Sequence, residues 1–575
     1  MLSELLESDK SLKFLSYADD FVIIKELSRL NQPIIDLNNT ICAIEDWCNY
    51  SGAELSIDKC KHLHICRKRN CSPVLNCNNY SICPVNKLKI LGITFNSKYK
   101  WDSHIEELST SLSKRLNIIK CLSNKNYSCD TSTLITITRS VIVSKISYGI
   151  YLYGYTSKAL LNKIKTTYNS AVRLSLGAHR TTKIFNLLFE ANLKTIEDYR
   201  DIATAQLIKT ILFNDKTPLM QMLNKALKTK KFYKTDSAIG RIVSACKSYN
   251  LPFNYPAPKT NNPYWRFNPA TLDTSLRKYS KEHTIPHLYV AEFQNICTKL
   301  QNYSFIFTDG SKINNVTSYS LVTDKRIIKT SLLPEYSSVF SAEIIAILEA
   351  IKFAKRSKGN FAIVSDSLSA LDSIANHNST EVYSSIIRDL LIQENRKIKL
   401  IWVPGHSNIL GNEFADAVAK QANKMPLIST ANTSPNDIKK HIQKDFSLKQ
   451  IEIWNSSSLW YKNLNRNKLN LHDYLHKDQL LSRSDQVKII RLRLGYCRLT
   501  HDQVIDRTLD KHCPFCRSST SDTTHIFLFC PHIKLLISNY FPNKSLLEIL
   551  SNINAPSNKL DLINFLKSCN LYNLI

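Results

Sequence analysis

Two aspartates in the middle of the chain stand where a sheet would place a reactive site. Asp309 follows the apolar run at residues 305–307, and Asp366 follows the apolar run at residues 361–364. Each run predicts a buried strand, so both carboxylates are expected at the carboxyl ends of strands, where open α/β sheets hold their sites. Taken singly, Asp309 before Gly310 also fits a plain turn, and either aspartate fits a helix N-cap.

Two further acids are expected on helices. Glu343 lies three residues after Phe340 and four before Ile347, on the apolar face of a predicted helix, with the edge of that face as the alternative. Asp416 belongs to another predicted helix, which begins near Asn412. A carboxylate on the packed side of a helix is unfavourable unless a cation or a partner group satisfies it.

Carboxylates gathered in this way have a well-defined chemistry. They repel one another and therefore need cations. The hard cation Mg²⁺ takes oxygen ligands and keeps several waters. Two such ions, ~4 Å apart, can activate an attacking water and stabilise the leaving 3′ oxygen.

Five short strings around these acids resemble the ribonuclease H family in order and spacing. The resemblance implies a mixed five-stranded sheet with flanking helices, and hydrolysis of RNA in RNA–DNA hybrids. It implies that two Mg²⁺ or Mn²⁺ ions are held by Asp309, Glu343, Asp366 and Asp416, and that the loop residue His406 assists proton transfer or product release. The strings are Thr-Asp-Gly-Ser-Lys at 308–312, Ser-Ala-Glu at 341–343, Ser-Asp-Ser at 365–367, Trp-Val-Pro-Gly-His at 402–406 and Gly-Asn-Glu-Phe-Ala-Asp at 411–416.

A basic protrusion that many members of this family carry between two helices is missing. Here the helix predicted near residues 381–394 leads almost directly into the strand that starts at residue 398. The basic flanking regions are therefore expected to hold the hybrid.

The N-terminal segment holds a second set of acids. Residues 14–24 read as two apolar strands around a tight turn, and an Asp-Asp pair alone fits a plain type I′ turn. The string nevertheless resembles the Tyr-Ala-Asp-Asp motif of reverse transcriptases, which implies polymerase roles for Tyr17, Asp19 and Asp20, and for Lys59 in the next motif. Further strings resemble jockey-like retrotransposons without long terminal repeats: residues 89–95, which resemble the primer-grip hairpin, Trp101, His104 and residues 177–182.

Polymerisation by this family needs another metal-binding aspartate well upstream of Tyr17. Only sixteen residues precede that tyrosine. We therefore expect a retroelement reading frame truncated at its N-terminus, whose chain alone cannot extend a primer. The proposed partners are RNA–DNA hybrids, other nucleic acid and element RNA in a ribonucleoprotein.

A Cys/His cluster near the C-terminus has zinc-ligand types at suitable spacing. Cys513, Cys516, His525 and Cys530 could bind one tetrahedral Zn²⁺, with two unrelated pairs of buried cysteines as the alternative. Their position resembles the C-terminal Cys/His motif of the same retroelements. Other nearby or irregularly spaced candidates are expected not to bind metal: His512, His532, Cys66, Cys71, Cys77 and Cys83.

The composition points to a polyanionic partner. The 575 residues include 76 Lys and Arg against 48 Asp and Glu, a formal net charge of +28. Such an excess favours nucleic acid, because neutralised phosphates release counterions. No uncharged apolar stretch reaches the ~18–20 residues of a spanning helix, and no apolar signal core is present. We therefore expect an intracellular protein of the nucleus or cytoplasm, without a membrane partner and with reduced cysteines.

These observations predict a multidomain chain of α+β and α/β parts. A helix is predicted over residues 33–50, and Leu161, Ile164, Tyr168 and Val172 form a helical stripe. The alternative to an enzyme is a decayed or domesticated protein that binds nucleic acid without cutting it. The expected parts are a partial reverse transcriptase palm at 1–102, a helical thumb or connection at 103–225, a basic proline-containing connector at 226–300, ribonuclease H at 301–424 and a helical C-terminal region with a zinc knuckle-like motif at 425–575.

Overall fold

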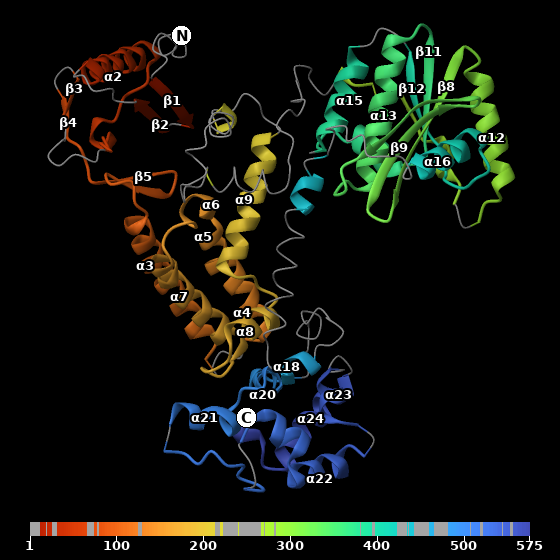
Figure 1. Ribbon diagram of the computed structural model, residues 1–575. Helices are drawn as coiled ribbons and strands as arrows, with labels where there is room; N and C mark the ends of the chain where they lie inside the picture. Colours follow the sequence, from red (N-terminus) through yellow and green to blue (C-terminus); the bar gives the residue numbers. More distant parts are fainter. Residues whose placement is uncertain are drawn as a thin grey trace. The chain divides into compact units, whose positions relative to one another are not determined.

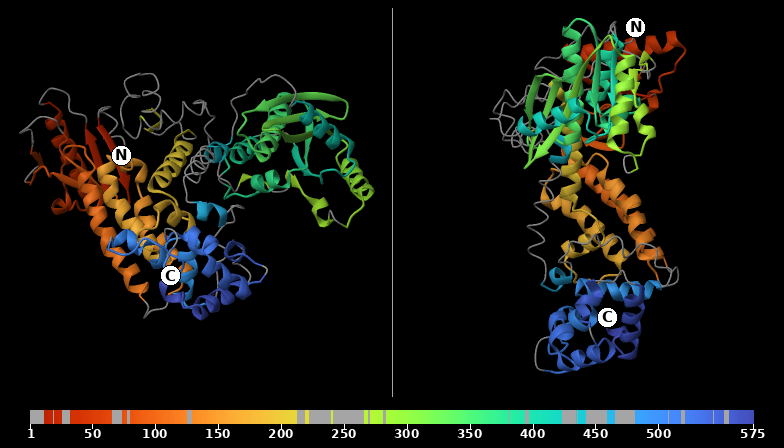
Figure 2. Two further views of the ribbon diagram at one scale, coloured as in Figure 1. Left: turned by 60° about the horizontal axis from the view of Figure 1, so that its bottom comes forward. Right: turned by 90° about the vertical axis from the view of Figure 1, so that its right-hand side faces the viewer.

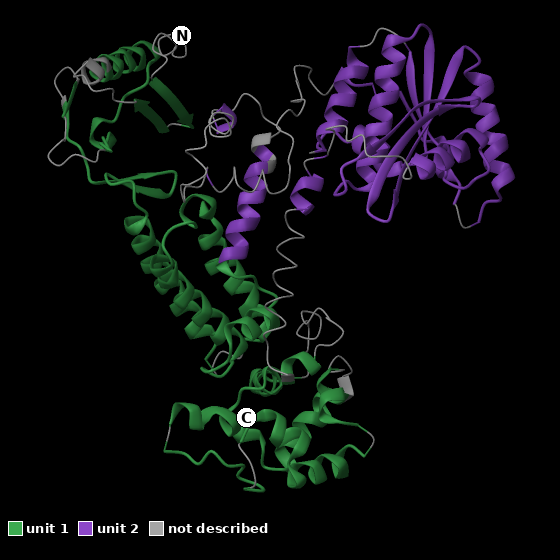
Figure 3. Cartoon of the chain, in the orientation of Figure 1, with its two compact units in different colours: residues 1–196, 458–575 green, residues 197–457 purple. Residues whose placement is uncertain are grey.

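A computed structural model of the chain contains two compact units (Figures 1 and 3). Unit 1 combines residues 1–196 with residues 458–575, and unit 2 comprises residues 197–457. Among the described helices, none has both the length and the apolar character needed to cross a membrane. The structure describes residues 12–18, 20–25, 32–65, 74–77, 80–124, 129–212, 219–221, 240, 266–268, 271–280, 283–379, 381–393, 397–422, 434, 436–441, 459–464, 481–506, 508–517, 521–542, 544–551 and 556–575.

Several residues to which the sequence analysis assigned a role lie outside the described residues, so their roles remain predictions. They are Asp19, Cys66, Cys71, and the Lys and Pro residues of the connector between residues 225 and 263.

Unit 1 begins with small antiparallel hairpins and one long helix. Tyr17 pairs with Asp20 across the turn between the first two strands. The helix predicted at residues 33–50 is confirmed as α2. The elements are β1 (Leu12–Tyr17), β2 (Asp20–Lys25), α2 (Gln32–Ser51), β3 (Leu75–Cys77), β4 (Tyr80–Ile82), β5 (Lys87–Ile90) and β6 (Ile93–Asn96).

A bundle of helices follows. The predicted stripe of Leu161, Ile164, Tyr168 and Val172 is confirmed as the buried face of α7. A π-helical turn, η2, interrupts the run between α4 and α5. The bounds are α3 (Asp102–Leu122), α4 (Thr131–Thr138), η2 (Arg139–Val143), α5 (Ser144–Ser147), α6 (Ile150–Tyr153), α7 (Lys158–Leu176) and α8 (Ile184–Glu190). The next helix, α9 (Ile196–Leu212), belongs to unit 2 from residue 197 onward.

The C-terminal helices of unit 1 surround their own apolar core, to which Trp460, Phe527 and Phe565 contribute. In both views of Figure 2 these blue helices lie against the orange helices of the same unit, and α20 packs on α4 and α8. The bounds are α18 (Leu459–Leu464), α20 (Arg483–Leu494), α21 (Arg498–Ile505), the π-helix η7 (His525–Phe529), α22 (Pro531–Tyr540), α23 (Leu546–Ser551), α24 (Pro556–Ser568) and η8 (Tyr572–Leu574).

A buried ionic network joins the two parts of unit 1. Arg493 of α20 donates from Nε to Oε1 of Glu190, at the end of α8, over 2.8 Å. The hydroxyl of Tyr461 donates to the other oxygen of Glu190 over 2.7 Å. The side chains of Arg493 and Glu190 are only 1% and 0% exposed. Because these ions are shielded from water, each depends on the other for charge compensation.

Unit 2 is built on a mixed sheet with the strand order β10-β9-β8-β11-β12-β7. Strands β8 to β10 are antiparallel neighbours, whereas β8, β11, β12 and β7 run parallel. The bounds are β7 (Leu272–Asp273), η6 (Ser275–Lys278), α12 (Pro286–Lys299), β8 (Tyr303–Ile313), β9 (Val316–Thr323), β10 (Arg326–Leu333), α13 (Val339–Arg356), β11 (Asn360–Ser365), α14 (Leu368–Ala375), α15 (Val382–Ile392), β12 (Ile398–Trp402) and α16 (Leu410–Ala422).

The sheet of unit 2 has an apolar layer on each face. Ile306 packs with α13, α14 and α15 on one face, while its neighbour Phe307 packs with α12 and α16 on the other. This alternation follows from the two-residue period of a strand. The predicted mixed sheet with flanking helices is confirmed, but it has six strands where five were expected. The additional strand, β7, comes from the range predicted as a connector.

Candidate functional site

Three of the four predicted carboxylates in unit 2 meet where the central parallel strands β8 and β11 stop pairing. Asp309, Glu343 and Asp366 each place an oxygen within 4.8 Å of the others. Asp309 lies in β8 and Asp366 directly follows β11, and the register pairs Thr308 with Ser365 across these parallel strands. Glu343 reaches the same place from α13. The convergence therefore follows from the sheet topology.

Two glycines allow this close approach. A Cβ at Gly310 would lie 2.8 Å from Cβ of Ala342 and 2.8 Å from the backbone nitrogen of Glu343. A Cβ at Gly405 would lie 2.7 Å from Oδ2 of Asp366. Any larger residue at either position would push the strand, the helix or the loop away from the acids.

The acids lie in an environment that disfavours their negative charge. Asp309 and Glu343 are 5% and 6% exposed. Oδ2 of Asp309 and Oε2 of Glu343 are buried without a hydrogen-bond partner among the described residues. Burial, and then repulsion from Asp366 and Asp416, raises the pKa of Asp309 to about 7. Burial also raises the pKa of Glu343 well above its usual value, with Asp309 adding to the effect.

Asp366 is buried less completely, and burial raises the pKa of its carboxyl as well. Its backbone oxygen accepts a hydrogen bond from Nε1 of Trp402 over 3.1 Å. The Trp402 side chain thereby fixes the turn after β11 against the end of β12. The cluster as a whole must hold either protons or cations to relieve its repulsion.

The fourth predicted carboxylate, Asp416, belongs to an adjacent set. It lies with His406 and Glu413, whose ligand atoms are within 4.8 Å of one another. Oδ2 of Asp416 forms an ion pair with Nζ of Lys420 over 2.6 Å. Asp416 remains near enough to raise the pKa values of Asp309 and Glu343. The structure thus brings together three predicted ligands and places the fourth beside them.

Glu413 and Lys420 had not been singled out from the sequence. Glu413 accompanies Asp416 in the string at 411–416, and its Oε1 is buried without a partner among the described residues. Lys420 lies four residues after Asp416, the spacing at which opposite charges meet on a helix. His406 has a positive φ of 58°, and its Nδ1 lies 3.7 Å from Oε2 of Glu413.

Hydroxyl groups of the neighbouring strand hold the helix that carries Asp416. Ser318 and Ser320 of β9 donate from Oγ to the backbone oxygens of Ala419 and Ala415, each over 2.7 Å. All four residues are buried. These bonds fix α16 across the sheet and so set the height of Asp416 above β8.

A family model for RNase H matches residues 301–424. Residues 301–424 are a ribonuclease H domain. The matched range contains every carboxylate of the two sets, and it supports ribonuclease H activity for the chain. Enzymes with such domains generally use divalent metals, which agrees with unpaired acids at this edge of the sheet.

The chain is also homologous to polymerases of a mobile element. It is 22% identical over 163 residues to the RNA-directed DNA polymerase from mobile element jockey of Drosophila melanogaster. The corresponding protein of Drosophila funebris is 20% identical over 163 residues. Each match covers 28% of this chain and spans 18% of the relative's length. The predicted resemblance to jockey-like retrotransposon proteins with ribonuclease H is confirmed.

Four Cys and His residues converge in the C-terminal part of unit 1. Ligand atoms of Cys513, Cys516, His525 and Cys530 all lie within 4.8 Å of one another. The Sγ atoms of Cys513 and Cys530 are 3.8 Å apart. Sγ of Cys516 lies 3.2 Å from Nε2 of His525. The π-helix η7 brings His525 and Cys530 together, because the backbone N–H of Cys530 donates to the His525 oxygen.

The two neighbouring histidines lie outside this cluster. His512 pairs through Nδ1 with Oδ1 of Asp510 over 2.8 Å. His532 is exposed on α22.

Burial raises the pKa of the Cys530 thiol, and its neighbour Cys513 adds to the effect. A cation that binds the thiolates would offset the free energy needed to deprotonate these cysteines.

The reverse transcriptase-like residues form no cluster of this kind in the described parts of the chain. Tyr17 is 68% exposed at the tip of its hairpin, and Asp20 and Lys59 are exposed. Their polymerase roles remain predictions.

Proposed function

We propose that this chain hydrolyses the RNA strand of RNA–DNA hybrids, with divalent cations at the carboxylates of unit 2. The observation that carries this proposal is a trio of clustered acids, two of which are buried and hold oxygens without any hydrogen-bond partner among the described residues. Such a trio is unfavourable in isolation and suits a hard cation with oxygen ligands. The jockey relatives support a retroelement origin for this activity.

The assignment of roles follows from the geometry. Asp309, Glu343 and Asp366 would hold the cations, which when bound would activate a water and stabilise the leaving oxygen. Asp416 is paired with Lys420 through Oδ2, so a cation could bind its Oδ1 or displace the lysine. Lys420 has a 49% exposed side chain, so opening this pair costs only about 1 kcal/mol or less. His406, exposed and next to Glu413, is positioned to exchange protons with solvent.

The test of this function is metal-dependent and strand-specific cleavage. With Mg²⁺ or Mn²⁺, the purified chain should cut the RNA of a labelled hybrid and leave duplex DNA and duplex RNA intact, because minor-groove shape and 2′-hydroxyls guide recognition. The Mg²⁺ concentration for half-maximal cleavage should fall as the pH rises through about 7, because Asp309 must lose its proton to bind a cation. Absence of hybrid cleavage at every metal concentration and pH would favour the alternative, a protein that only binds nucleic acid.

We further propose that Cys513, Cys516, His525 and Cys530 hold one Zn²⁺. Elemental analysis should find about one zinc per chain, the stoichiometry of a single tetrahedral site. Cys516→Ser should remove it, whereas Cys121→Ser, which changes an exposed free cysteine of α3, should leave the zinc content unchanged. Equal zinc in both variants would reject the assignment.

A further inference from the structure

A short segment beyond the ribonuclease H range packs back onto the same unit. It comprises residue 434 and the helical residues 436–441, and is called the clasp segment here. The clasp segment belongs to unit 2 but lies outside the matched range 301–424. Ser434, Asp437 and Ile438 are only 1%, 2% and 0% exposed. Two polar side chains are thus buried against the unit, and buried polar groups need hydrogen-bond partners.

The first anchor of the clasp segment is Glu381, which directly precedes α15. The Ser434 hydroxyl lies 3.1 Å from each carboxylate oxygen of Glu381, and Nδ2 of Asn436 donates to Oε2 over 3.0 Å. Burial raises the pKa of Glu381, and the bonds from Ser434 and Asn436 oppose this rise. A buried carboxylate depends on such donors, so the segment is held firmly at the start of α15.

The second anchor is the start of α13, the helix that carries Glu343. Oδ2 of Asp437 accepts a hydrogen bond from the backbone N–H of Ser338 over 2.9 Å. Ser338 is the N-cap of α13. Its Oγ accepts from the N–H of Ser341 over 3.2 Å, and its backbone oxygen accepts from the N–H of Ala342 over 3.2 Å. Ser341 and Ala342 directly precede Glu343, so the bond to Asp437 fixes the residue on which this first turn is built.

The peptide group between Ser337 and Ser338 is held at both of its ends. From the sheet, Nζ of Lys312 in β8 and Oγ1 of Thr317 in β9 donate to the Ser337 oxygen over 2.7 Å and 2.9 Å. From the clasp segment, Asp437 accepts the N–H of the same peptide group. The sheet and the clasp segment together therefore determine where α13 begins.

The site tolerates little movement of α13. A Cβ at Gly310 would lie 2.8 Å from the backbone nitrogen of Glu343, so the helix is already packed closely on β8. The oxygens of Asp309, Glu343 and Asp366 approach within 4.8 Å of one another. Because Mg²⁺ binds oxygens at about 2.0–2.1 Å in near-octahedral geometry, a small shift of α13 away from the strand would weaken its binding.

We propose that Asp437 is a positioning residue of the ribonuclease H site. By accepting the Ser338 N–H, it fixes the start of α13 at the height at which Glu343 reaches a cation held by the other two acids. This inference rests on the cation site of the proposed function, and it adds a residue from outside the matched range.

The test measures Mn²⁺ binding to the full chain without substrate, from the electron paramagnetic resonance signal of the free ion. The relevant sites are those that Asp366→Asn removes. Asp437→Ala should weaken binding at these sites roughly tenfold, the lower end of the loss expected when a group that supports a metal ligand is removed. Asp437→Asn should bind within about twofold of the parent chain, because its amide oxygen can accept the same N–H.

Cleavage of a labelled hybrid gives a second readout. In Asp437→Ala the Mg²⁺ concentration for half-maximal cleavage should rise by the same factor as the loss of Mn²⁺ affinity. The rate at saturating Mg²⁺ should stay close to that of the parent chain, because the ligands themselves are unchanged. A general loss of structure would instead lower the rate at every Mg²⁺ concentration.

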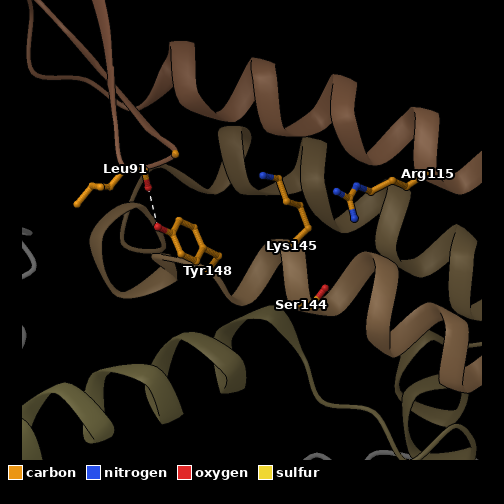
Figure 4. Close-up of a pocket in the computed structure, with 6 residues that line it drawn as sticks. Leu91, Arg115, Ser144, Lys145 and Tyr148 are labelled. Atoms are coloured by element: carbon orange, nitrogen blue, oxygen red, sulfur yellow. Dashed lines mark hydrogen bonds between the residues drawn. The ribbon is translucent and has the colours of Figure 1, made fainter. Parts of the chain in front are cut away.

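Two control variants should leave Mn²⁺ binding unchanged. Lys440→Ala alters an exposed residue of the clasp segment itself. Tyr148→Phe removes a bond of similar kind in unit 1, where the Tyr148 hydroxyl donates to the backbone oxygen of Leu91 over 2.6 Å (Figure 4). Equal losses in a control and in Asp437→Ala would contradict a specific role of Asp437.

Hydrogen exchange places the effect within the unit. In Asp437→Ala, the peptide that covers residues 338–343 should exchange faster, whereas peptides of β12 should keep their rate. Parental Mn²⁺ affinity in Asp437→Ala, or an equal loss in Asp437→Ala and Asp437→Asn, would overturn the positioning role and leave the proposed function intact. If the parent chain bound no Mn²⁺ at sites that Asp366→Asn removes, the proposed cation site and this inference would both be rejected.

Discussion

Asp366→Asn should reduce the rate of RNA cleavage in a hybrid by about a thousandfold. The substitution keeps the size of the side chain and the bond from Trp402 to the Asp366 backbone, but it removes an anionic ligand from the trio. Cations in such sites supply several kcal/mol of stabilisation to the charged transition state, and ~4 kcal/mol corresponds to this factor. The measurement is single-turnover cleavage of labelled hybrid at saturating protein.

A matched control distinguishes the site from general damage. Asp372 lies in α14 of the same unit and is 52% exposed beside Arg277. Asp372→Asn should leave cleavage within about twofold, because exposed pairs contribute little. Affinity of Asp366→Asn for the hybrid should stay close to that of the parent chain. Cleavage at the parental rate by Asp366→Asn would place the catalytic acids elsewhere.

Glu190→Ala should lower the free energy of unfolding of unit 1 by about 3–5 kcal/mol, the usual loss when one member of a buried ion pair is removed. Arg493 would then be left almost fully buried without its counter-ion, and the Tyr461 hydroxyl would lose its acceptor. Hydrogen exchange, followed by mass spectrometry in peptides that cover α8 and α20, should accelerate strongly. Peptides from the ribonuclease H sheet should exchange at their original rate.

Two comparisons make this prediction specific. Glu106→Ala breaks an exposed pair, whose Lys163 and Glu106 side chains are 51% and 59% exposed, and should cost about 1 kcal/mol or less. Glu190→Leu combined with Arg493→Met should be less destabilising than either single change, because neither charge is then left unpaired. A double variant as unstable as the sum of the single ones would show that the two side chains act independently.

The extent to which the sequence predicted the candidate site depended on how locally each ligand is encoded. The Cys/His cluster spans residues 513 to 530. The spacing of its four ligands predicted that they converge, and they do converge in the structure. Asp309, Glu343 and Asp366 are far apart in the chain, but each follows a recognisable strand or helix. Their meeting could be foreseen only through the family resemblance, because topology decides which strands become neighbours.

Three other features of the structure could not be predicted from the neighbouring sequence. The strand β7 has two residues, too few to show the alternation by which strands are recognised. The pair of Glu190 and Arg493 joins positions 303 residues apart, and no periodic pattern links them. The ion pair of Asp416 with Lys420 has helical spacing, but spacing alone does not show whether the lysine or a cation occupies the carboxylate.

The order of the units along the chain has a consequence for synthesis on the ribosome. Unit 2 is inserted between the two segments of unit 1. Arg493 emerges 303 residues after Glu190, which at ~5–20 residues per second is a delay of roughly 15–60 s. The sheet of unit 2 can therefore form its core before α20, which packs on α4 and α8, has been synthesised. During that interval the first segment would expose the apolar surface of α4 and α8 that α20 later covers, and Glu190 would lack the bond from Arg493.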